Sequence, residues 1–114
     1  MIISGDTSFV RLSEGSTARD AFENAVTEDR DKYGSKDSTG TLADKDSFIN
    51  MKLPAGEDPM DFAKNMFERL DRRCSDKDGP CACIDITGST HALMYLNDKG
   101  IKNKKVYMFF GMSG

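Results

Sequence analysis

The pattern of apolar positions predicts two amphipathic helices in this chain. The first has Thr17 as its N-cap, with Asp20 three residues on, and ends before Gly34. Its apolar stripe recurs at i, i+3, i+4, i+7 and i+8, and consists of Ala18, Ala21, Phe22, Ala25 and Val26. The second starts at Glu57 or Asp58, with Pro59 in its first turn. Its expected buried stripe is Phe62, Ala63, Met66, Phe67, Leu70 and Cys74.

Short apolar runs predict the strands. Residues 9–12 favour an opening strand, residues 48–53 alternate in polarity, and residues 81–86 follow a Gly-Pro turn. Residues 106–112 are β-branched, aromatic or otherwise apolar and carry no charge, which is typical of a buried strand. We therefore expect this last segment to pair as a buried strand within a sheet.

Residues 92–96 fit either a further strand or a short helical turn. In the strand interpretation, residues 97–100 form a turn, and residues 106–112 return as the second arm of a hairpin. The resulting order, β-α-β-α-β-β-β, implies an α+β protein with two helices packed on one face of a mostly antiparallel sheet of about four strands. At 114 residues, the chain has room for one core, so we expect residues 1–114 to form a single compact domain.

Charge narrows the classes of function. The net charge of −3 argues against general nucleic-acid binding, which needs a basic surface. Residues 13–46 hold nine acids against five bases, so their surface could meet a basic partner or could be a solvated helix face. No apolar stretch approaches the roughly 20 residues that span a bilayer. The first residues also lack the pattern of a signal peptide. We therefore expect a cytoplasmic protein without membrane contact.

The cysteines and the single histidine are weak candidates for chemistry. Cys81 and Cys83 with Cys74 and His91 lack the paired spacing of a structural zinc site, and alternate thiols suit the core of a strand. An enzyme using Cys83, Asp85 or His91 is the least favoured interpretation, because no orienting third group is evident. We therefore assign no catalytic residue, no metal and no cofactor.

A glycine-containing polar loop is a candidate for phosphate binding. Thr39, Gly40 and Thr41 with Lys45 could offer backbone amides and a cation to a nucleotide or a phosphate-bearing signal. The loop lacks the Walker and Rossmann spacings, so a structural turn is the competing interpretation.

Three segments together resemble a family of small proteins from bacteriophages and mobile elements. They are Tyr33-Gly34 with the Gly40-Thr41-Leu42-Ala43-Asp44-Lys45 loop, Gly79-Pro80-Cys81-Ala82-Cys83-Ile84, and Phe109-Phe110-Gly111-Met112. The likeness spans about residues 17–114. It departs from the family pattern at Met112, where the family has tryptophan, and at Cys81, where it has alanine. The resemblance implies a phage or mobile-element origin and no particular activity.

This origin favours a non-enzymatic inhibitor that binds a host factor, counter-defence proteins of the anti-CRISPR type among them. The expected partner is a host protein with a basic surface, such as a nuclease complex, and a homo-oligomer is left open. The alternative is a small-ligand binding protein. The residues expected to carry binding are Glu23, Glu28, Asp29, Asp31, Thr39, Gly40, Thr41, Asp44 and Lys45.

Overall fold

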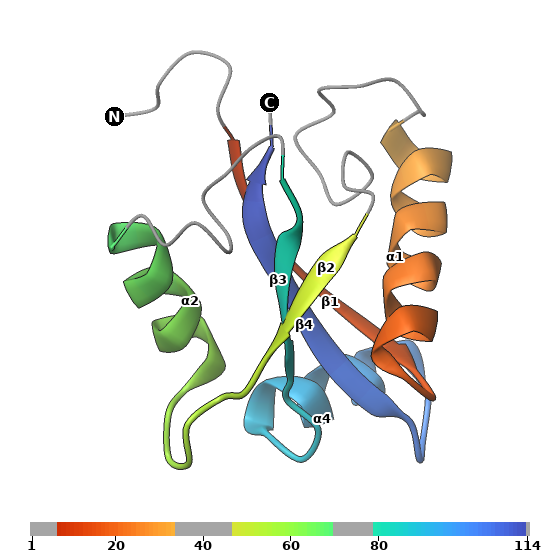
Figure 1. The fold of residues 1–114 in the computed structure, drawn as a ribbon. Coiled ribbons are helices and arrows are strands. Elements are labelled where there is room, and N and C mark those ends of the chain that lie inside the picture. The colour runs from red at the N-terminus through yellow and green to blue at the C-terminus, as the bar shows by residue number, and fades with distance from the viewer. Residues whose placement is uncertain (1–6, 34–46, 70–78, 114) are drawn as a thin grey trace.

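A four-stranded sheet organises the chain (Figure 1). The computed structural model describes residues 7–33, 47–69 and 79–113. Its elements in chain order are β1 (Thr7–Gly15), α1 (Ala18–Tyr33), β2 (Phe48–Met51), α2 (Pro59–Glu68), β3 (Cys81–Asp85), α4 (Thr90–Lys99) and β4 (Lys105–Ser113).

The last strand in sequence is an inner strand of the sheet. The order is β1-β4-β3-β2, and β4 runs antiparallel to both of its neighbours, while β2 and β3 are parallel. The strands β1, β2 and β3 therefore run in one direction, and each is followed by a helix. The expected α+β class with a mostly antiparallel sheet is confirmed, as is a strand over residues 106–112.

Helices cover both faces of the sheet. Along β4, Val106, Met108 and Phe110 belong to one core cluster, which includes side chains of α2 and α4. Tyr107 and Phe109 belong to a second cluster, built with α1. Figure 1 shows α1 and α2 on either side of the strands. The expectation that both helices pack on one face is therefore wrong: they lie on opposite faces. Consecutive apolar residues of one strand point to both sides of the sheet, and both sides need cover.

The strand interpretation of residues 92–96 is wrong, and the helical alternative is correct. The side chain of Ser89 accepts a hydrogen bond from the amide of Ala92 and caps α4. At the other end Gly100 adopts the left-handed conformation, φ 70°, that commonly closes a helix. The hairpin with residues 106–112 is therefore also wrong. The partners of β4 are β1 and β3 instead.

The predicted helix starts are confirmed. The amide of Asp20 donates to Thr17 Oγ1 at 3.1 Å, and the Asp58 carboxylate accepts from the amides of Met60 and Asp61 at 3.0 and 3.2 Å. Helix α2 ends at Glu68. Two residues of its expected stripe, Leu70 and Cys74, lie outside the described residues.

Aromatic rings link α1 to the sheet. Phe109 of β4 meets Phe22 of α1 and Phe48 of β2, each with ring centroids 5.6 Å apart, and the Phe22 and Phe48 centroids are 5.0 Å apart. On the other face, Phe110 contacts Phe62 and Phe67 of α2 edge to face. Such pairs contribute about 0.5–1.5 kcal/mol each beyond the burial of their area.

We expect Phe109→Ala to lower the free energy of unfolding by about 3–5 kcal/mol, because it removes the ring shared by α1, β2 and β4 and leaves a cavity. Urea unfolding followed by circular dichroism measures the loss. Met94→Ala is the matched control: this side chain is 61% exposed, so the change should stay within about 0.5 kcal/mol. Equal losses for both variants would contradict the assignment of Phe109 to the core.

Candidate functional site

Polar side chains form a cluster around the outer edge of the sheet at β1. Strand β1 is an edge strand, and alternate residues point to opposite faces. Arg11 reaches α1, whereas Glu14 reaches α4. We call this group the edge cluster; it consists of Arg11, Glu14, Glu28, Asp29, Tyr95 and Lys99.

Arg11 is the centre of the edge cluster. Its Nη2 lies 2.6 Å from Oε1 of Glu28, and its Nε lies 3.1 Å from Oδ1 of Asp29. Its Nη1 donates to the carbonyl oxygen of Leu12 at 2.7 Å. The three bonds hold the planar guanidinium in one orientation and tie α1 to β1.

Lys99 extends the edge cluster to α4. Its Nζ lies 3.3 Å from Oε2 of Glu28 and 4.0 Å from Oε1 of Glu14. The Tyr95 hydroxyl donates to the same Glu14 oxygen at 2.5 Å. Helices from opposite faces of the sheet are thereby joined around its edge.

The edge cluster favours the charged forms of Glu28 and Arg11 and the neutral form of Tyr95. Burial acts to raise the pKa of Glu28, but hydrogen bonds from Arg11 and Lys99 outweigh it, and this pKa lies below its ordinary value. Burial acts to lower the pKa of Arg11, yet its two carboxylate partners raise it above its ordinary value. The pKa of Tyr95 is raised, first by burial and then by its bond to Glu14.

The edge cluster divides the predicted acidic site residues into two groups. Asp29 is only 6% exposed and is held by Arg11, as is Glu28. Both carboxylates are therefore already paired with a cation of the same chain. Glu23 and Asp31, in contrast, are exposed, and their side chains have no partner within the described residues.

The second group lies on the outer side of α1. At 100° per residue, Asp20, Glu23 and Asp31 fall within about 80° of the helix circumference. All three are exposed, and we call them the outer acidic face. Two arginines flank it: Arg30 is exposed, and the Arg19 guanidinium lies 5.9 Å from the centre of the Phe48 ring.

The residues predicted for the phosphate-binding loop lie outside the described residues; they are Thr39, Gly40, Thr41, Asp44 and Lys45. Their role stays a prediction.

The candidate catalytic residues do not come together. Cys81 and Cys83 are buried, and burial, then Cys81 and Asp85, raises the pKa of Cys83 to about 12. The Cys83 thiol therefore stays protonated at neutral pH and is a poor nucleophile.

Asp85 is exposed and accepts from the amide of Thr87 at 2.9 Å. His91 lies elsewhere, with Nε2 3.1 Å from Oδ1 of Asp58. Within residues 7–33, 47–69 and 79–113, no three His, Cys, Asp or Glu side chains are placed to hold a metal ion.

Sequence reasoning did not identify Arg11 and Lys99 as the residues that separate the paired acids of α1 from the unpaired ones. Arg11 is 17 residues from Glu28, and Lys99 is 71 residues from it. No local spacing rule connects positions so far apart. The only available signal was an arginine within an otherwise apolar strand segment.

Comparison with known protein families, curated proteins and solved structures found no relative of this α+β domain. No protein-family model matches the sequence, and neither a curated protein nor a solved structure matches it. Among the described residues, no helix has the length and apolar character needed to cross a membrane.

We expect Arg11→Gln to lower the free energy of unfolding at pH 7 by about 2–4 kcal/mol, because Asp29 would remain buried without its cation. Lys99→Gln is the control. Its bridge to Glu28 is more exposed, so the loss should be about 1 kcal/mol or less.

The Arg11 effect should also depend on pH. Because the pKa of Glu28 is lowered in the folded state, its contribution is present above its unfolded pKa, about 4.3, and disappears as pH falls through the folded value. Urea unfolding at pH 7 and at pH 3 should therefore show a smaller difference between wild type and Arg11→Gln at pH 3. A difference that grows on acidification would refute this role of the edge cluster.

Proposed function

We propose that this protein acts by binding a basic surface of another protein through the outer acidic face of α1, and that it blocks that partner. The observation that carries the proposal is the division of charge on α1. Glu28 and Asp29 are both ion-paired with Arg11, whereas Asp20, Glu23 and Asp31 are exposed and have no side-chain partner among the described residues.

Packing makes this surface a suitable platform. The opposite side of α1 is buried through Ala21, Phe22, Ala25 and Val26, and the edge cluster ties the helix to β1. The acids are thus presented on a rigid element, so little conformational entropy is lost when a partner binds. Complementary charge then accelerates encounter and selects against acidic partners.

The resemblance to phage and mobile-element proteins supports a host factor as the partner, with a nuclease complex as one class. An inhibitor of this kind needs no catalytic residue. The low reactivity expected of the Cys83 thiol agrees with that interpretation.

The test is capture from a bacterial lysate by the immobilised protein, with a rising salt gradient. A partner bound through the outer acidic face should elute between about 0.1 and 0.5 M NaCl, where the screening length falls from about 10 Å to a few ångströms. The double variant Glu23→Gln/Asp31→Asn should lose that partner, because it removes two of the three unpaired charges.

The matched control, Asp61→Asn/Asp98→Asn, removes the same charge from exposed positions on α2 and α4 and should retain the partner. Retention by both variants, or elution that is indifferent to salt, would overturn the proposal. A rise in thermal stability with nucleotides, without any salt-dependent capture, would instead favour the small-ligand alternative.

A further inference from the structure

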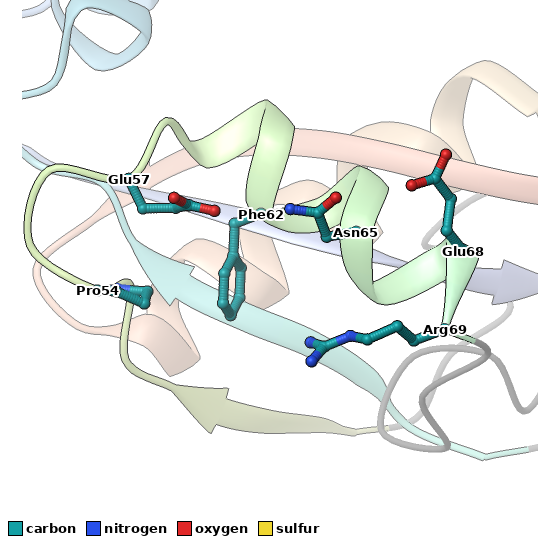
Figure 2. Close-up of a pocket in the computed structure, with 6 residues that line it drawn as sticks. All are labelled: Pro54, Glu57, Phe62, Asn65, Glu68 and Arg69. Atoms are coloured by element: carbon teal, nitrogen blue, oxygen red, sulfur yellow. The ribbon is translucent and has the colours of Figure 1, made fainter.

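An open pocket lies along α2, separate from the outer acidic face of α1. Its volume is about 450 Å³, and it is lined by Pro54, Glu57, Phe62, Asn65, Glu68 and Arg69 (Figure 2). This volume falls within the roughly 300–1,000 Å³ of sites that bind small molecules.

Local structure positions the two ends of the pocket. At the start of α2, the Asp58 cap and the buried Pro59 set the first turn, and the amide of Glu57 donates to the carbonyl oxygen of Pro54 at 3.1 Å. At the end of the helix, the amide of Arg69 donates to the carbonyl oxygen of Asn65 at 3.0 Å. Glu57 and Arg69 are therefore held at opposite ends of a ten-residue helix.

Between the ends, Phe62 supplies an apolar floor. One side of its ring meets Phe110 of the core, with centroids 6.2 Å apart and planes at 89°. The ring is only half-buried, so the rest of its surface is open to the pocket. In Figure 2 the ring lies between Pro54 and the Arg69 guanidinium.

The polar groups of the pocket are available to a ligand. Figure 2 shows the Glu57 carboxylate and the Asn65 amide pointing toward each other beside Phe62, whereas the Glu68 carboxylate points away. Among the described residues, no ion pair or side-chain hydrogen bond occupies Glu57, Asn65 or Arg69. The pocket therefore offers the Glu57 carboxylate, the Arg69 guanidinium and an aromatic surface between them, and a second carboxylate, that of Glu68, is among its lining residues.

We propose that this pocket binds a short segment of another protein, in extended conformation, with a basic side chain at Glu57, an apolar side chain on Phe62 and an acidic group at Arg69. The acidic group is an Asp or Glu side chain or a C-terminal carboxylate, and Arg69 can bind it through two parallel hydrogen bonds.

Dimensions favour a peptide over a free amino acid. The ten-residue helix is about 15 Å long at a 1.5 Å rise per residue. Three to five extended residues span about 10–17 Å, a length comparable with that of the helix. A free amino acid carries both charges on one carbon and cannot meet both ends.

Charge favours a ligand with both signs. A purely anionic ligand would meet Arg69, but its remaining negative charge would face the Glu57 carboxylate. A purely cationic ligand would meet Glu57, but its remaining positive charge would face the Arg69 guanidinium. Like charges in contact disfavour binding, so the pocket selects against both.

The test uses three capped pentapeptides, Lys-Ala-Leu-Ala-Glu, Lys-Ala-Leu-Ala-Lys and Glu-Ala-Leu-Ala-Glu, titrated into the 15N-labelled protein. The Lys–Glu peptide should shift the amide signals of residues 54–57 and 62–69, and should bind at least ten times more tightly than the other two. The variant Arg69→Glu should invert this preference and bind the Lys–Lys peptide most tightly.

The control Arg30→Glu makes the same charge change on α1 and should leave the preference unchanged. Both positions are exposed, and a well-dispersed amide spectrum shows that each variant is folded. Equal affinity for the three peptides, shifts confined to other residues, or an unchanged preference in Arg69→Glu would each overturn the proposal. Because none of these measurements changes an acid of the outer acidic face, their failure is distinct from failure of the proposed function.

Discussion

The rest of the structure depends on the burial of β4 on both faces. Its residues Val106, Tyr107, Met108, Phe109 and Phe110 are all buried, and they alternate between two hydrophobic clusters. A strand with apolar side chains on both sides must lie inside a sheet that has helices on both sides. The inner position of β4, the edge position of β1 and the separation of α1 from α2 all follow from this constraint.

With β1 at the edge, one side of the sheet has no further strand among the described residues. The edge cluster surrounds that side, and Arg11 and Asn24 donate to the carbonyl oxygens of Leu12 and Glu14. Occupied edge carbonyls discourage the addition of a further strand from another chain. The same cluster determines which acids of α1 are ion-paired and which remain exposed without a side-chain partner among the described residues. One set of contacts therefore both protects the edge of the sheet and leaves the outer acidic face exposed.

The two proposed surfaces lie on opposite faces of the sheet, one on α1 and one on α2 (Figure 1). They differ in chemistry: the first is an exposed acidic surface, and the second is a pocket with charges of both signs around Phe62. A partner on one face leaves the other open. Under the two proposals, the partner on α1 and the segment on α2 would be separated by the sheet, with the phenylalanines of the two clusters packed on either side of β4 between them.

The sequence by itself determined the features that depend on neighbouring residues. The helix starts at Thr17 and Asp58 and the buried character of β4 follow from capping chemistry and apolar periodicity, which act over a few residues. For the same reason it left residues 92–96 ambiguous, since a short apolar run suits either a strand or a helix. Only the tertiary structure decided the pairing of β4 with β1, the ion pairs of Arg11, and the alignment of Glu57 and Arg69 beside Phe62. Each of these joins groups that are distant in the chain or that lie at opposite ends of a helix, and such contacts arise only when the core brings them together.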